Sequence, residues 1–154
     1  MALKKLEFKK VINASADKVY NTMLGINSIE TYEQWTSEFG PNSTYEGSWD
    51  KGSKIRFVGI AEDGTRGGMV SEIAENIPAK FVSIRHNGFI KGEEEITEGV
   101  EVEKWAGALE NYSFSENNGV TTVTAEIDVT EEYAEYFNKT WPKALDKLKE
   151  LTEK

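Results

Sequence analysis

Residues 120–151 read VTTVTAEIDVTEEYAEYFNKTWPKALDKLKEL, and within them a strand pattern gives way to a helix pattern. Apolar and polar residues alternate from Val123 to Val129, which predicts a strand with one packed face and one wet face, as in an antiparallel sheet. From Tyr133 to Leu151 apolar side chains recur at three- and four-residue steps, so one face of a long helix is apolar. Thr130 can cap this helix, and Pro142 predicts a kink or a restart because proline lacks a backbone N–H.

The sequence before this point is a succession of short strands and turns, preceded by two short helices. Alternating stretches separated by turn residues run from Gly40 to Val129, and Asn117–Gly119 is a strong hairpin signal. A first strand over Leu6–Ile12 is followed by a helix that Ser15 can cap and by a second short helix that carries Trp35. Antiparallel sheets with helices at the chain ends belong to the α+β class.

These patterns predict one domain over residues 1–154 in the α+β class. It has a seven-stranded curved antiparallel sheet wrapped around the long C-terminal helix, with two short helices after the first strand.

Composition excludes several classes of function. The chain has 18 Lys and Arg against 27 Asp and Glu, a net charge of −9, so we expect no binding to nucleic acid or to anionic membrane surfaces. It has no cysteine, which excludes disulfides, thiol nucleophiles and iron–sulfur clusters. No stretch approaches the ~18 apolar residues of a membrane span, and the N-terminus lacks the apolar core of a signal peptide. We therefore expect a cytoplasmic protein without membrane insertion.

The predicted architecture raises the question of what fills the space under the sheet. One helix is ~10 Å wide and cannot fill the concave side of a strongly curved sheet. Either large side chains pack that space, or they line a pocket for a small apolar or amphipathic molecule. The residues expected to line such a pocket are Trp35, Phe57, Met69, Ile84, His86, Trp105, Tyr112, Phe137 and Trp141.

Catalytic and metal-binding motifs are weak in this sequence. His86 is the single histidine, and its strand position predicts an inward side chain that either is structural or orients a ligand. Glu110 shares the parity of Tyr112, so an inward acid–base pair of His86 and Glu110 is an alternative. There is no nucleophile-elbow serine and no phosphate-binding glycine loop. The acidic run Lys91–Glu103 is typical of a solvated loop and lacks the spacing of a calcium loop. We expect no cofactor, no metal and no assigned catalytic residue.

Six stretches carry a resemblance to a known family, in the family's order: Val11–Tyr20, Tyr32–Trp35, Gly47–Ser53, Gly68–Ile73, Pro78–Phe81 and Trp141–Leu148. The chain resembles the START-like, helix-grip superfamily, also called the SRPBCC or polyketide-cyclase/dehydrase and lipid-transport group. Within it, the chain is most similar to the branch named after the activator of heat-shock chaperone ATPase.

The resemblance implies the helix-grip fold and leaves three functions open. The first is binding of a small apolar or amphipathic molecule between the sheet and the last helix. The second is a stress-response accessory role with a heat-shock chaperone as partner, which the net charge of −9 disfavours because the chaperone is itself acidic. The third is an enzyme of the cyclase or hydratase kind that uses the same cavity.

Overall fold

The computed structural model describes residues 3–40, 42–60 and 63–154. Its elements, in chain order, are β1 (Lys4–Ile12), α1 (Ala16–Leu24), α2 (Ile29–Thr36), β2 (Thr44–Gly47), β3 (Lys54–Ile60), β4 (Arg66–Ile77), β5 (Phe81–Lys91), β6 (Glu94–Ile96), α3 (Val100–Glu103), β7 (Ala108–Asn117), β8 (Val120–Val129) and α4 (Glu131–Glu153).

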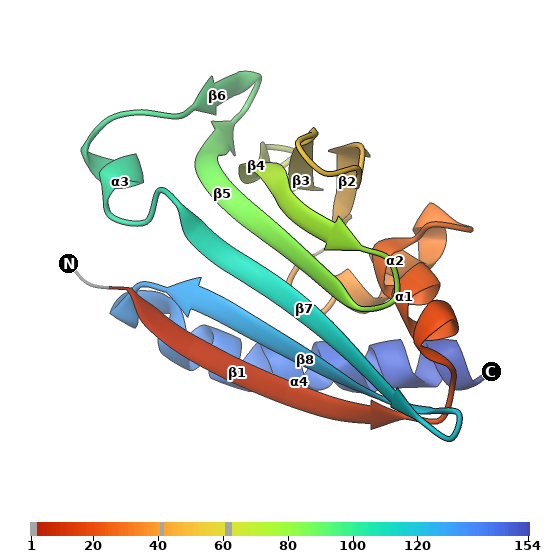
Figure 1. Ribbon diagram of the computed structural model, residues 1–154. Helices are drawn as coiled ribbons and strands as arrows, with labels where there is room; N and C mark the ends of the chain where they lie inside the picture. The colour runs from red at the N-terminus through yellow and green to blue at the C-terminus, as the bar shows by residue number, and fades with distance from the viewer. Residues whose placement is uncertain (1–2, 41, 61–62) are drawn as a thin grey trace.

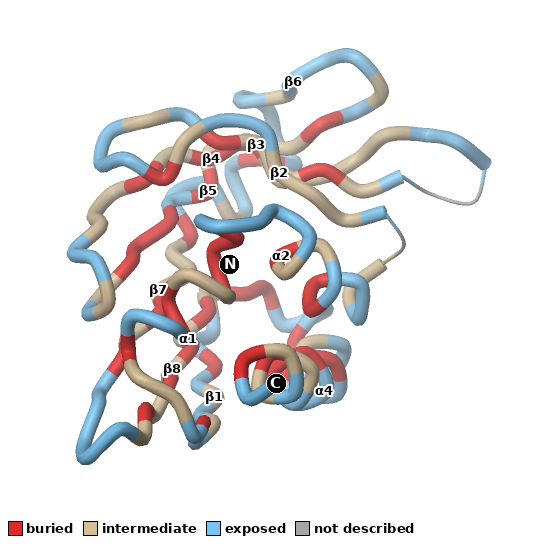
Figure 2. Tube along the Cα trace, turned by 90° about the vertical axis from the view of Figure 1, so that its right-hand side faces the viewer, coloured by how far each residue is buried: buried red, intermediate tan, exposed pale blue. Residues whose placement is uncertain are grey.

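One antiparallel sheet forms the body of the molecule. Its strand order is β1-β8-β7-β5-β4-β3-β2, and the short β6 pairs with β5 outside this path. The sheet curves, and α1, α2 and α4 lie on its concave side (Figures 1 and 2). The α+β helix-grip architecture is therefore confirmed. The described strands number eight rather than seven, because part of the acidic run pairs with β5.

Local sequence signals explain where α1 begins and where the β7–β8 hairpin turns. The Ser15 hydroxyl accepts a hydrogen bond from the Lys18 N–H at 3.2 Å and so caps α1 as predicted. The β7–β8 hairpin turns at Asn118 and Gly119, both with positive φ. Thr130 occupies the N-cap position of α4, but its hydroxyl makes no capping bond. Helix α4 continues through Pro142 without a restart.

The core lies between the concave face of the sheet and the helices α1, α2 and α4. Its largest fully buried side chains come from α1, α2, α4 and the inward positions of the strands; they include Val19, Met23, Trp35, Ile84, Leu145 and Leu148. Burying a side chain of this size contributes about 1.5–3 kcal/mol, so Leu145 and Leu148 each stabilise the packing of α4 on the core. None of the helices in the described part of the chain combines the length and apolarity needed to cross a membrane.

Candidate functional site

The predicted pocket residues converge on the concave side, and most of them contact one another. Trp35 and Trp141 lie with ring centroids 5.8 Å apart, and Tyr112 lies 6.0 Å from Trp141. The rings of Phe57 and His86 pack edge to face, with their centroids 6.2 Å apart. Ile84 belongs to the same core cluster, and Phe137 packs against Phe39 at its border.

Two of the nine predicted residues lie toward one end of the concave face. Met69 pairs with Phe57 on one side and with Phe89 on the other, so these three side chains share the inner face. Trp105 stands apart from the main cluster and packs on Phe89, with ring centroids 6.3 Å apart.

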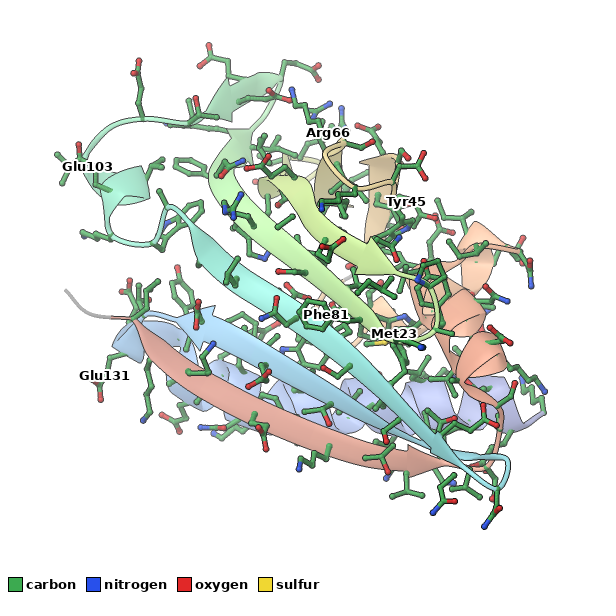
Figure 3. All side chains as sticks on the ribbon, in the orientation of Figure 1. Met23, Tyr45, Arg66, Phe81, Glu103 and Glu131 are labelled. Carbon is green, nitrogen blue, oxygen red and sulfur yellow. The ribbon has the colours of Figure 1, made fainter. Side chains whose placement is uncertain are left out.

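Of the two alternatives that the sequence left open, a packed core and a pocket, buried side chains favour the packed core beneath the sheet (all side chains are drawn in Figure 3). Trp35 and Trp141 are 1% and 2% exposed, and Phe8 stacks on Trp141 at 6.0 Å. Two open grooves lie elsewhere on the described surface, with volumes of about 670 and 290 Å³, and neither is lined by any of the nine residues. Along α1, α2 and the second half of α4, the aromatic residues therefore form a packed core.

A chain of hydrogen-bonded polar side chains crosses this apolar interior. The Ser71 hydroxyl lies 2.7 Å from Nδ1 of His86, and Nε2 of His86 lies 3.0 Å from Oε1 of Glu110. The Tyr112 hydroxyl donates to Oε2 of the same carboxylate. The chain thus connects β4, β5 and β7 across the middle of the sheet.

Strand register explains why these four side chains meet. Ser71 pairs with His86, and Ile84 pairs with Glu110, so all four residues belong to one face of the sheet. A register shift after Val70 realigns β4 with β5, which places Ser71 opposite His86. The predicted inward pairing of His86 and Glu110 is thus present in the structure.

The carboxylate of Glu110 influences two buried phenols. Burial, followed by the charge of Glu110, raises the pKa of Tyr112 well above its usual range. The same two causes, in the same order, raise the pKa of Tyr32. Both phenols therefore stay protonated and remain hydrogen-bond donors at neutral pH.

One end of the polar chain is partly open to solvent. The side chain of Glu110 is 21% exposed, whereas that of His86 is 10% exposed. Phe57, Met69 and Phe89 on the same face are half-buried. Helix α4 makes its main contacts with β1, α2 and α1. We call the half-buried set of Phe57, Met69, Phe89 and Glu110 the open end of the concave face.

Sequence reasoning missed several members of this site. Ser71 was not singled out, although a small polar residue between Met69 and Ile73 on an apolar strand face is a usable signal. The buried indole N–H groups of Trp49 and Trp141 have no hydrogen-bond partner among the described residues, which no sequence pattern predicts.

The acidic run Lys91–Glu103 forms no metal site in the described part of the chain, where no group of three His, Asp or Glu side chains comes together. Glu95 instead bonds Lys54 at 2.6 Å and Arg56 at 3.0 Å. The remaining acidic side chains of the run are exposed. The prediction of a solvated loop therefore needs the correction that β6 and α3 give it structure.

Comparison with known proteins gives a family match and several similar folds. A family model described as Activator of Hsp90 ATPase homolog 1-like protein matches residues 13–153. No curated protein matches the chain. The Aha1 dimer of Colwellia psychrerythraea, solved in solution, is similar at 21% identity and a TM-score of 0.69 over 97% of this chain and 96% of that one.

Two further structures have the same fold. Protein NE0264 of Nitrosomonas europaea is 15% identical with a TM-score of 0.71, over 96% of this chain and 93% of that one. Protein ChR145 of Cytophaga hutchinsonii is 19% identical with a TM-score of 0.67, over 99% of this chain and 97% of that one. At these identities the likeness shows the fold alone.

Proposed function

The chain belongs to the family of activator of Hsp90 ATPase homolog 1-like proteins, and on that premise we propose that it binds a small apolar or amphipathic molecule on the concave face of its sheet. One observation carries this proposal: a hydrogen-bonded polar chain ends in a partly exposed carboxylate, Glu110, on an otherwise apolar face.

The polar chain is not required for packing alone. Polar groups in an apolar interior lower stability unless every one is hydrogen-bonded, and an apolar core of equal shape needs none of them. Small-molecule sites, in contrast, combine apolar walls with a few polar groups that orient the ligand. Ser71, His86, Glu110 and Tyr112 have the composition of such an orienting set.

The open end of the concave face supplies the apolar walls. Phe57, Met69 and Phe89 offer half-buried apolar surface beside Glu110, and Phe137 of α4 is half-buried at the edge of the core. A ligand that covers these side chains gains the hydrophobic free energy of their remaining exposure, about 25 cal/mol per Å². Its polar group would meet Glu110.

Native mass spectrometry of protein purified from its own host tests the proposal. We expect bound mass that disappears on denaturation, and chemical-shift changes at Phe57, Met69 and Glu110 when the extracted ligand is returned. Met69→Asn makes the apolar wall polar without adding a charge and should weaken binding strongly. Val100→Asn, at an exposed site on α3, is the matched control. Ligand-free spectra, with no thermal stabilisation by any lipid or aromatic compound, would count against the proposal.

A chaperone accessory role is the second candidate, favoured by the family to which the chain belongs. It predicts that the protein binds the host's Hsp90-type chaperone and changes its ATPase rate. A pull-down combined with an ATPase assay decides this candidate. If the chaperone neither binds the protein nor changes its rate, this role is removed and the ligand proposal is left untouched.

An enzyme of the cyclase or hydratase kind is the third candidate, favoured by the 3.0 Å hydrogen bond between His86 and Glu110. An acid–base pair must lie inward and within reach of the reacting group. Incubating the purified protein with the ligand found by mass spectrometry tests this candidate. An unchanged ligand mass argues for binding alone, whereas product that His86→Gln abolishes argues for catalysis.

A further inference from the structure

We propose that the molecule bound at the open end of the concave face is an organic cation, an amine or quaternary ammonium group carried on an apolar body. This inference rests on the proposed binding function and names the chemical class of its ligand. It follows from the charge of Glu110 and from the apolar and aromatic side chains near it.

Glu110 differs from the other paired carboxylates of the protein. Glu95 is neutralised by Lys54 and Arg56. Glu72 pairs with Arg85 at 3.0 Å. Within the described part of the chain, Glu110 has no lysine or arginine within 4.0 Å, and its partners are an imidazole and a phenol.

When the imidazole of His86 is neutral, the hydrogen bonds around it leave the negative charge of Glu110 without a positive partner. Ser71 can donate its hydroxyl proton to Nδ1 of a neutral imidazole, which then donates its Nε2–H to Glu110. Tyr112 donates a second hydrogen bond to Glu110 and stays neutral, because burial and that charge keep its proton in place. A partly exposed carboxylate in apolar surroundings with two neutral donors favours a cationic ligand.

Two aromatic side chains lie close to this carboxylate: Tyr112 donates a hydrogen bond to it, and the ring of Phe57 lies 6.2 Å, between centroids, from its other partner, His86. Phe57 lies 6.3 Å from Tyr32 and 5.8 Å from Trp49, measured between ring centroids, and Tyr112 belongs to the same core cluster. Ring faces attract organic cations within about 6 Å, most strongly where water is excluded. A partly exposed carboxylate with the half-buried ring of Phe57 nearby offers both of the forces that recognise ammonium groups.

The same features disfavour an anionic ligand such as a fatty acid. Its carboxylate would face Glu110, and no lysine or arginine side chain of the described residues is paired there to receive it. The chemistry of the site therefore separates three classes of amphipath by headgroup: cationic, neutral and anionic.

A matched series of headgroups on one tail tests this inference. Phenylbutylammonium, phenylbutanol and phenylbutyrate are titrated into the full-length protein at neutral pH and near-physiological salt, with calorimetry and backbone chemical shifts as readouts. We expect the ammonium compound to bind about tenfold more tightly than the alcohol, and the carboxylate to bind most weakly.

Two variants separate the effect of Glu110 from the general attraction of an acidic protein. Glu110→Gln should remove the preference for the ammonium compound and leave the affinity for the alcohol within about twofold. Glu150→Gln changes the net charge by the same amount at an exposed site on α4 and should leave the preference intact. The headgroup comparison on the wild-type chain needs no variant, so it tests the inference even if Glu110→Gln fails to fold.

The outcomes are distinguishable. Equal binding of the alcohol and the ammonium compound, or a preference that survives in Glu110→Gln, overturns the cation inference and leaves the proposed binding function standing. Tightest binding of the carboxylate also overturns it. Failure of all three compounds to bind counts against both the inference and the proposed function.

Discussion

Replacing Tyr112 by phenylalanine tests the polar chain most directly. Tyr112 is 3% exposed, and its hydroxyl donates to Oε2 of Glu110. The substitution keeps the ring and its contact with Trp141, so packing changes little. The substitution removes only the Tyr112 hydroxyl, so the Glu110 carboxylate loses one of its two hydrogen-bond donors.

The expected loss of stability follows from the burial of this hydrogen bond. A hydrogen bond to a charged group contributes about 1.5–3 kcal/mol. The side chain of Glu110 is 21% exposed, so water can replace part of the lost bond. We expect Tyr112→Phe to lower the free energy of unfolding by about 2 kcal/mol, and the melting temperature of a domain of this size by about 6 °C.

Urea unfolding of Tyr112→Phe, of Glu110→Gln and of the double variant measures this value. With a neutral acceptor at position 110, the cost of losing the hydroxyl should shrink to about 1 kcal/mol. Tyr133→Phe, at a residue that is 55% exposed, is the control and should stay within about 0.5 kcal/mol of wild type. If Tyr112→Phe is as stable as this control, the polar chain does not exist as described.

Three further predictions concern the backbone, the core and the pH dependence. Gly68→Ala should be at least about 2 kcal/mol less stable than Gly64→Ala in urea unfolding, since both glycines have positive φ but an added Cβ at Gly68 would lie 1.8 Å from the Phe57 carbonyl oxygen. Leu148→Ala, at a side chain with 0% exposure, should cost about 2–5 kcal/mol; a smaller loss would mean that α4 is not packed on the core. Burial, followed by the charge of Glu110, raises the pKa of Tyr32 in the folded protein, so the unfolded chain loses this proton first. The contribution of Tyr32 to the free energy of unfolding should therefore be constant below about pH 10 and fall by about 1.4 kcal/mol per pH unit above it. When the free energy of unfolding is measured against pH, Tyr32→Phe should fall less steeply than wild type on the alkaline side.

Periodicity in the sequence predicted the order of the elements and the face that each one buries. The alternation from Val123 to Val129 determined the inner face of β8, and the parity of Glu110 with Tyr112 determined that both point inward. Ser15 and Asn117–Gly119 specified a helix cap and a hairpin through hydrogen bonds and φ angles of the residues themselves. These features are local, because each depends on residues a few positions apart.

Only the tertiary structure decided how the inward side chains share the space beneath the sheet. Whether Trp35 and Trp141 line a hollow or fill it depends on how closely α2 and α4 approach each other, and those helices are far apart in sequence. The meeting of Ser71 with His86 depends on a register shift in β4, which alternation alone does not reveal. A repeating pattern specifies the face of one element, whereas the distance between two elements is the joint outcome of all the side chains packed between them.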